Sequence, residues 1–451
     1  MLHIRLKLTY LMAGLMAALC LTACTADDSD YGGSTEPAGV ADSVYIHLRI
    51  AMQADPLTRA VNDHGAAEEY EVKNGMLILF KSAANKGEDE AIVTIAYTFD
   101  ELGITGHFQD DAMSSVTQSA NIVTSIAREA IPKNPDEKLY ALVLVNYEGN
   151  SGFSVDVDDH ILKYDDVDQT GKHLADLQTI TLSSFNANGF YMANAPMSDG
   201  SNVTTLVQVA KIFVSEEQAK NSDATMVFVE RAAAKIIVND ETAGKDTGIT
   251  VDGNAANIAR VHQVSWAVDR YNTSFYALRD NGGSPLCDTN LFEGISRAMW
   301  AKDVHFDDAP ENVGTYEYRQ PGTSVYVAEH TVNNTNANYA TSIVIKLRLK
   351  DASNVIISKS GQQLYGNTGA PTQLFTTAAK RDAYVTAKGL DADNNIAYDN
   401  GELYYRRNIQ QDTGYLGVVR DNVYRLTVKS FGQIGAATAA TATAPVPAPA
   451  P

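Results

Sequence analysis

The sequence predicts an all-β protein with minor helices, built from two antiparallel β-sandwich domains. Short apolar or β-rich runs recur along the chain, separated by clusters of Gly, Asn and Asp, which is typical of strands joined by turns. The first of these runs alternates strictly between apolar and polar residues, as a half-buried strand does. The chain shows no alternation of strands with helices, which argues against a parallel α/β sheet.

Length and composition set the number of domains. The chain has 451 residues, of which 45% are hydrophobic, so it can bury a core and divides into about two domains. We place the boundary near residues 231–240, giving domains at 43–232 and 233–435. Cys20 and Cys24 lie at the N-terminus and leave Cys287 alone, so we expect no internal disulfide in the body.

The charge argues against nucleic acid as a partner. Lys and Arg total 35 against 55 Asp and Glu, a formal net charge of −20. Such a surface repels a phosphate backbone instead of releasing its counterions.

The N-terminus, residues 1–24, resembles a bacterial lipoprotein signal. Arg5 and Lys7 precede the apolar run Leu8–Leu21, which is too short to span a bilayer comfortably. The run ends in Leu21-Thr22-Ala23-Cys24, which resembles a lipobox in which Cys24 is acylated. An ordinary signal peptide that happens to contain a cysteine is the alternative.

Residues 25–42 are expected to be a flexible tether, because they are rich in Gly and small polar residues. Asp27, Asp28 and Asp30 follow the cysteine closely. This resembles the acidic stretch of Bacteroidetes lipoproteins that are exported to the cell surface.

The strand predicted most clearly begins the folded region. Its apolar face carries Val44, Ile46, Leu48, Ile50 and Met52. Its opposite face carries Tyr45, His47, Arg49 and Ala51.

Further strands are expected at 75–80, 91–99, 139–147, 203–214, 226–238, 342–349 and 416–428. One helix is expected over Val116–Ile131, because apolar residues recur there at helical spacing and Pro132 follows. Residues 436–451 contain only Ala, Thr, Val and Pro, so we expect an exposed tail without a core.

Signatures of catalysis and metal binding are weak. The usual zinc, serine-hydrolase, phosphate-loop and dinucleotide motifs are missing from the sequence, so no enzyme, cofactor or metal site is predicted. The acidic run from Asp156 to Asp168 lacks the glycine and glutamate of a calcium-binding hand loop. Cys287 has no histidine nearby in the sequence. Trp266, Trp300 and the tyrosines could form a sugar platform, although core packing is the simpler interpretation.

A single basic residue marks the loop after the first strand. Arg59 is the only Lys or Arg between Arg49 and Lys73, so an arginine-specific protease would have one choice there. Exposed polar loops of this kind are where proteolytic nicking concentrates. Any loop can contain an arginine, so the loop alone does not establish cleavage.

The chain resembles the fimbrial major subunits of the Bacteroidales type V pilus, most closely the short-fimbria, Mfa-type branch. The resemblance runs from Cys24 to about Gly435. It is carried by the lipobox, by Thr58-Arg59-Ala60 ahead of Glu68-Glu69, and by the segments 139–146, 190–194, 229–236, 404–406 and 417–422.

This resemblance implies two tandem transthyretin-like β-sandwiches and assembly by strand exchange. It implies lipidation at Cys24, cleavage between Arg59 and Ala60, and removal of the strand from Val44 to Met52. The implied partners are other copies of the chain, accessory fimbrial subunits, an arginine-specific surface protease and, through the lipid, the outer membrane. The implied location is a fimbrium on the cell surface, with a role in adhesion and virulence.

The C-terminal region departs from the family pattern. Members continue past a Pro-rich spacer into a donor strand, whereas four prolines here lie within the last seven residues and remove ladder amides. A donor would then come from residues 422–434, through Tyr424, Leu426 and Val428. Alternatively, these residues close the second domain and the chain donates poorly, as a tip subunit would.

Two rival functions stay open from the sequence. The chain could be a monomeric or tip-located surface lipoprotein that binds a glycan or a host protein. An acidic hydrolase is the weaker rival, because no nucleophile, base and orienting group can be assembled from the sequence.

Overall fold

The computed structural model describes residues 43–444, with gaps at 54–66, 84–85, 105–108, 111–115, 135, 199–202, 280–288, 293–294, 299–302 and 411–414. The residues from Ala41 onward form one compact unit. The predicted all-β class is confirmed, since strands dominate the described residues and the helices are few and short. The division into two domains near residue 232 stays a prediction.

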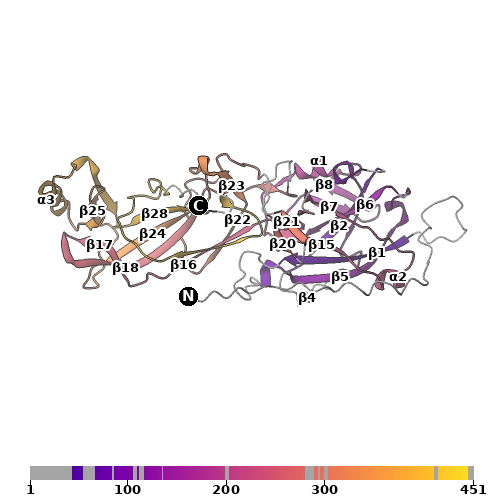
Figure 1. Ribbon diagram of the computed structural model, residues 1–451, viewed down its shortest axis with the longest axis horizontal. Coiled ribbons are helices and arrows are strands. Elements are labelled where there is room, and N and C mark those ends of the chain that lie inside the picture. The colour runs from indigo at the N-terminus through magenta and orange to yellow at the C-terminus, as the bar shows by residue number, and fades with distance from the viewer. Residues whose placement is uncertain are drawn as a thin grey trace, which may run out of the picture. The chain divides into compact units, whose positions relative to one another are not determined.

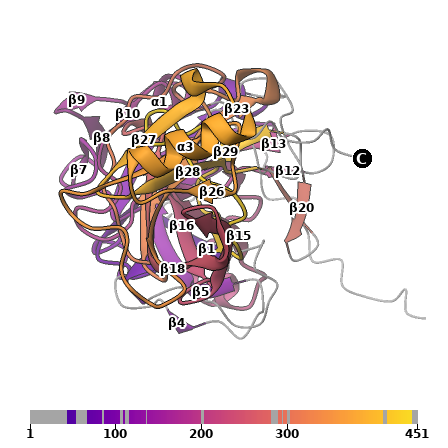
Figure 2. The same ribbon diagram turned by 90° about the vertical axis from the view of Figure 1, so that its left-hand side faces the viewer.

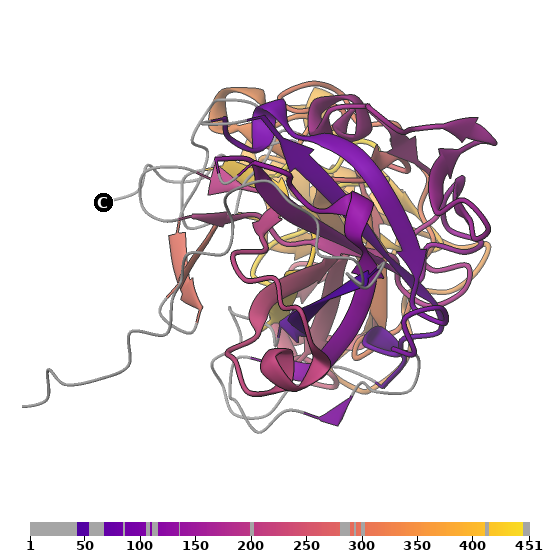
Figure 3. The same ribbon diagram turned by 90° about the vertical axis from the view of Figure 1, so that its right-hand side faces the viewer.

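The largest sheet has nine strands in the order β3-β2-β6-β11-β15-β1-β5-β4, with β14 paired to β6. Its strands are β1 (Ser43–Gln53), β2 (Gly75–Ser82), β3 (Ile92–Thr98), β4 (Gln109–Asp110), β5 (Val116–Ala127), β6 (Lys138–Val145), β11 (Met192–Asn194), β14 (Val207–Gln208) and β15 (Thr225–Arg231). Figure 1 shows β1 and β5 side by side, and Figure 3 shows the twist of these strands.

This sheet is buried on both faces along β2 and β6. In β2, Leu77 and Leu79 join one hydrophobic cluster, while Ile78 and Phe80 join another on the opposite face. Strands β1, β5 and β15 contribute to the same cluster as Leu77 and Leu79. The sheet therefore curls around this first core, and its far face packs on a second one.

Smaller elements cover the second core. They are β7 (Phe153–Asp156), β8 (Ile161–Tyr164), β9 (Val167–Asp168), α1 (Leu174–Gln178), β10 (Thr181–Leu182) and β19 (Phe275–Tyr276). Leu162, Leu174, Leu177, Leu182 and Phe275 belong to this core. Two further short elements flank the sheet: α2 (Glu216–Lys220) and the sheet β13-β12-β21-β20. The latter strands span Val203–Thr204, Met197–Ser198, Ile295–Ala298 and Thr289–Phe292.

The C-terminal half has its own core, whose members lie between Ala234 and Phe431. Its two main sheets have the orders β22-β16-β30 and β26-β17-β18-β24-β28. The strands are β16 (Ala234–Asp240), β17 (Asp246–Val251), β18 (Asn254–Asp269), β22 (Ser324–Val327), β24 (Ser342–Lys350), β26 (Gln373–Leu374), β28 (Leu403–Asn408) and β30 (Val423–Val428).

Two strand pairs complete this half: β23 (His330–Asn333) with β29 (Tyr415–Val418), and β25 (Gln363–Asn367) with β27 (Asn395–Asp399). The helix α3 (Ala378–Lys388) begins at Thr377, whose hydroxyl accepts from the Lys380 amide. It ends at Gly389, whose φ of 64° favours glycine. Figure 2 views the molecule from the end that carries α3. Short 3-10 turns are η1 (Ala67–Glu69), η2 (Glu88–Glu90), η3 (Arg128–Ala130), η4 (Asn334–Asn336) and η5 (Ala392–Asn394).

The helix predicted at Val116–Ile131 is wrong. Residues Val116–Ala127 form β5, and η3 follows. Ala120, Ile122, Thr124 and Ile126 also recur at every second residue, and all four are buried. Since β-branched residues are dense here and β1 supplies an antiparallel partner, the strand pattern prevails over the helical one.

Two other expectations need correction. The sheets are not purely antiparallel, because β1–β15, β16–β30 and β17–β26 are parallel pairs. Three expected runs are each two strands: 226–238 is β15 and β16, 203–214 holds β13 and β14, and 416–428 holds β29 and β30.

The expected exposed tail begins inside the fold. Ala436 exchanges two backbone hydrogen bonds with Tyr404 of β28. The buried Arg406 guanidinium donates to the carbonyls of Ala442 and Ala439, at 2.9 and 3.3 Å. Ala439 and Ala442 are themselves buried, so the segment 436–444 packs against the second half. Residues 445–451 lie outside the described part.

Candidate functional site

The predicted removable strand, β1, occupies an interior position in the nine-stranded sheet. It pairs antiparallel with β5 from Ser43 to Gln53, and parallel with β15 from Leu48 to Met52. A strand with neighbours on both sides cannot leave without opening two ladder edges. Each edge would then present unpaired amides and carbonyls, which can template pairing with another chain.

The apolar face of β1 is buried as the alternation predicts. Val44, Ile46, Leu48, Ile50 and Met52 are each at most 3% exposed, and all five lie in the first core. Burying a side chain of this size contributes about 1.5–3 kcal/mol. Removing β1 from its groove, the space between β5 and β15, would therefore forfeit roughly 8–15 kcal/mol. The groove is therefore stable only with a strand of similar pattern in it.

The chain on either side of β1 includes the other predicted processing residues. Cys24 lies outside the described residues, and so do Arg59 and Ala60 in the segment 54–66. The described chain resumes at Ala67, with η1. The lipidation and cleavage sites therefore stay predictions.

Glu69, at the end of η1, is fixed by two cations. Its carboxylate is 1% exposed and accepts from Arg231 Nη1 at 2.5 Å and from Lys235 Nζ. Arg231 Nε also donates to Asp421 Oδ1 at 2.9 Å. Burial acts to lower the pKa of Arg231, but Asp421 and Glu69 together outweigh it and raise that pKa. The guanidinium thus stays charged and joins η1 to the turn before β30.

A second set of buried ion pairs adjoins the first. Arg279 Nη2 lies 2.8 Å from Glu230 Oε2, and Arg420 Nη2 lies 2.6 Å from Glu329 Oε1, with all four side chains at most 3% exposed. Burial acts to raise the pKa of Glu329, but Arg420 and Arg279 outweigh it and lower that pKa. The two sets together hold four cations and four carboxylates, so their charges balance.

These ion pairs were not predicted from the sequence. Five of their eight residues lie in two of the segments that carry the family resemblance: Glu230, Arg231 and Lys235 in 229–236, and Arg420 and Asp421 in 417–422. Adjacent opposite charges at 230–231 and at 420–421 are the available signal. The partners lie up to 190 residues apart, so local pattern alone does not pair them.

The possible donor residues occupy a strand of the chain's own second half. Tyr424, Leu426 and Val428 lie in β30, which pairs in parallel with β16. Tyr424 is 8% exposed and belongs to the core there, while Leu426 and Val428 pack against that core. In this chain β30 is therefore a strand of the second half's own sheet.

A groove of about 1110 Å³ runs beside β30 and β28. Ile343 and Ile345 of β24 contribute apolar surface, and Arg407, Arg425 and Lys429 contribute basic groups.

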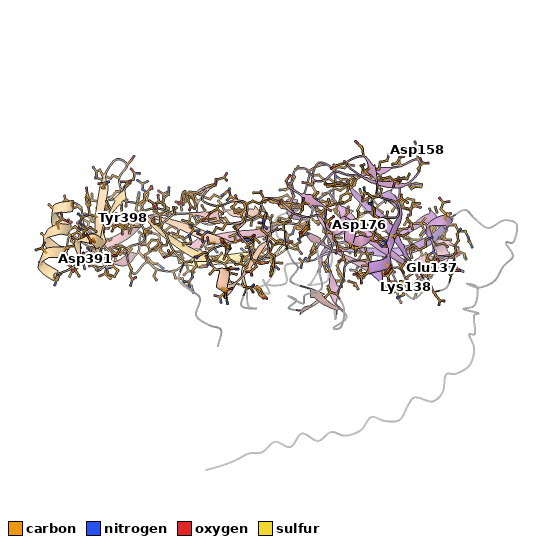
Figure 4. The ribbon with its side chains drawn as sticks, turned by 90° about the horizontal axis from the view of Figure 1, so that it is seen from above. Glu137, Lys138, Asp158, Asp176, Asp391 and Tyr398 are labelled. Atoms are coloured by element: carbon orange, nitrogen blue, oxygen red, sulfur yellow. The ribbon has the colours of Figure 1, made fainter. Side chains whose placement is uncertain are left out.

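The remaining candidates show no built site. Asp158 lies at the periphery of the β7–β8 hairpin, as Figure 4 shows, and Lys163 Nζ pairs with Asp156 Oδ2 at 2.7 Å. Trp266 is fully buried in the second-half core. Trp300 and Cys287 lie outside the described residues.

Within the described ranges, no group of three or more His, Cys, Asp or Glu residues could hold a metal ion. A search of that same part of the chain for helices that are long and apolar enough to cross a membrane found none.

No family model and no curated protein matches the sequence. Among solved structures, the chain is similar to a fimbrilin from Porphyromonas gingivalis, with 13% identity and a TM-score of 0.41 over 87% of this chain and 91% of that one. It is also similar to a fimbrial assembly protein from Parabacteroides distasonis, with 14% identity and a TM-score of 0.30 over 69% of this chain and 85% of that one.

The tip fimbrial protein Mfa3 from Porphyromonas gingivalis is similar at 13% identity and a TM-score of 0.30, over 68% of this chain and 80% of that one. These structural neighbours are fimbrial proteins of Bacteroidales bacteria. At such identities and TM-scores the likeness assigns no activity or partner to this chain.

Proposed function

We propose that the chain is a structural subunit of a surface fimbria that polymerises by strand exchange. The central observation is the position of β1 in the sheet and the burial of its apolar face. It is an interior strand with five buried apolar side chains, and it is joined to the rest of the fold through the segment that holds Arg59. Cleavage there would free β1 from its only covalent link to the downstream chain.

The anchoring of Glu69 supports this proposal. Because Arg231 and Lys235 fix Glu69 to β15 and β16, a cut between Arg59 and Ala60 leaves the downstream chain attached to the body. Only the upstream segment with β1 would be released. A strand from another subunit would then restore the ladder hydrogen bonds and the five apolar contacts by β-augmentation.

In this scheme the precursor is a lipoprotein acylated at Cys24 and held at the outer membrane until an arginine-specific protease cuts it. Its partners are other copies of itself and accessory fimbrial subunits, and the polymer supports adhesion. No catalytic step and no cofactor take part.

A tip or acceptor position is the second candidate. The engagement of β30 in the chain's own core favours it, because Tyr424, Leu426 and Val428 could act as donors only after leaving β16. A tip subunit could bind a glycan or host protein through its surface loops.

The proposal is tested with Arg59→Ala and Arg128→Ala, the latter an exposed arginine of η3 that serves as the matched control. After treatment with an arginine-specific protease, wild type and Arg128→Ala should form heat-resistant ladders on a gel. Arg59→Ala should stay monomeric, because its own β1 competes at high effective concentration. Ladders from Arg59→Ala would contradict cleavage at this site.

A further inference from the structure

Residues 213–222, which we call the strap, lie against the start of β1. Phe213 and Tyr45 exchange two backbone hydrogen bonds, both of 2.8 Å. The strap continues through α2, where the Ser215 hydroxyl accepts from the Gln218 amide, and ends at Ser222, whose hydroxyl donates to the Ala219 carbonyl. It thus bridges the start of β1 on the side where β15 pairs only from Leu48 onward.

His47 makes a side-chain polar contact between β1 and the strap. Its side chain lies on the outer face and the residue is 8% exposed. Nδ1 lies 2.9 Å from the Ser222 carbonyl oxygen, and Nε2 lies 2.7 Å from the Asn121 amide oxygen on β5. The carbonyl can only accept, so Nδ1 donates to it. The imidazole therefore joins β1 to the strap through Nδ1, and its Nε2 lies beside the Asn121 side chain of β5.

We propose that His47 is the residue by which the groove distinguishes its own strand from other apolar strands. This inference rests on the strand-exchange function proposed above and names a specificity-determining residue for it. An incoming strand would need a hydrogen-bonding side chain at the position of His47. Without one, the Ser222 carbonyl loses its partner beneath the strap.

The apolar face of the groove cannot provide this distinction alone. Five aliphatic or thioether side chains fill it, and hydrophobic sites tolerate exchange among side chains of similar volume. Polar contacts discriminate better, because an unsuitable residue leaves a desolvated group unpaired.

His47 also fixes the register. Because side chains alternate between the two faces, a shift of one residue would turn an imidazole into the first core and place an aliphatic side chain under the strap. The contact with Ser222 can form only when the five apolar residues occupy their own positions.

The first test uses the intact chain and hydrogen exchange. Compare wild type with His47→Phe, which preserves ring bulk without the hydrogen bonds, and with Tyr45→Phe as a control on the same face of β1. We expect the Phe213 and Tyr45 amides to exchange about tenfold faster or more in His47→Phe, with little change in β6. Unchanged protection of the strap in His47→Phe would overturn the proposal.

The second test measures selectivity. A sequence-specific protease site is inserted into the segment 54–66, the chain is cut, and a labelled peptide of residues 43–53 competes with the chain's own β1. A His47→Phe peptide should bind about tenfold more weakly or worse than the wild-type peptide. His47→Gln, which can still donate, should recover part of the loss, and Tyr45→Phe should match wild type.

The outcomes separate the two proposals. Equal binding of the wild-type and His47→Phe peptides would refute the role of His47 while leaving strand exchange intact. If even the wild-type peptide fails to enter the cut protein, strand exchange is contradicted. The hydrogen-exchange comparison then still decides whether His47 holds the strap.

Discussion

Strands β1 and β30 are both paired in parallel with a neighbouring strand, but they differ in how deeply they are buried. Each runs parallel to a neighbour in its sheet, β1 to β15 and β30 to β16. β1 is an interior strand, whereas β30 is the last strand on its side of the described sheet. The strand that we propose to leave is thus the better buried one. In the proposed scheme its loss would need a full replacement, which would link cleavage to assembly.

The two strands also share an anchor. Arg231 bonds Glu69, which follows the segment after β1, and Asp421, which lies in the turn before β30. One guanidinium therefore holds the chain that would remain after the proposed cleavage and the chain that enters the last strand.

Removing this anchor should give the largest effect. Arg231→Gln removes the cation that two buried carboxylates, Glu69 and Asp421, share, and should lower the free energy of unfolding by about 3–5 kcal/mol. Urea denaturation followed by fluorescence measures it. Arg260→Gln removes an exposed pair with Asp246 and should cost less than about 1 kcal/mol. Equal losses in the two variants would contradict the anchoring role.

The difference in burial between the strands is tested by matched truncations. Leu48→Ala in β1 should cost about 2–5 kcal/mol, because Leu48 is fully buried. Leu426→Ala in β30 should cost less, since Leu426 is partly exposed. Both values come from denaturation of the uncut chain. A larger loss at Leu426 would reverse the comparison.

The segment that follows β30 depends on Arg406. Arg406→Gln removes the donors to Ala439 and Ala442 and leaves Asp269 with Arg270, whose Nε lies 3.8 Å from its carboxylate, at a cost of about 1–3 kcal/mol. Residues 436–444 should then become accessible to proteolysis, as mass spectrometry of the fragments would show. Arg407→Gln, at the exposed neighbouring position, is the control and should leave the segment protected.

The smallest expected effect is a dependence of folding stability on pH, which arises from one carboxyl group in each half. Burial raises the pKa of Glu88, near β14, to about 7, and burial together with Glu329 raises that of Asp303, near β23, to about 7. Since both folded pKa values exceed the unfolded ones, the folded state binds more protons between about pH 4 and 7. Stability should fall as the pH rises through this window and then level off, and the pKa of His330, which burial lowers to about 4, opposes part of the fall.

Thermal midpoints at pH 5.5 and pH 8 check this sign, and Glu88→Gln should flatten part of the slope. A midpoint that rises steadily between these two pH values would show that the two carboxyl groups do not govern the dependence.

Sequence reasoning succeeded where local pattern determines structure. The alternation from Val44 to Met52 gave the strand and its buried face, since side chains at every second position share one face. It failed at Val116–Ala127, where both periodicities fit and the pairing with β1 decides. It also missed the contact between Arg406 and the Ala/Thr segment, because composition alone suggested nothing to bind those residues.

The candidate site was predictable only in part. The apolar face of β1 followed from the sequence, whereas the strap over His47 did not, because Ser222 lies 175 residues away along the chain. The ion pairs of Glu69 and Arg231 depend on a fold that brings distant segments together. Local chemistry thus predicts the strand, and tertiary structure adds the polar contacts that make its site specific.

The fate of β1 in assembled fibres tests the central claim most directly. Heat-resistant polymer is purified, its N-terminus is sequenced, and tryptic and non-tryptic digests are searched by mass spectrometry for residues 43–53. Strand exchange after cleavage predicts subunits that begin at Ala60 and contain no peptide from 43–53. Polymer whose subunits begin upstream of Ser43 and retain β1 would contradict it.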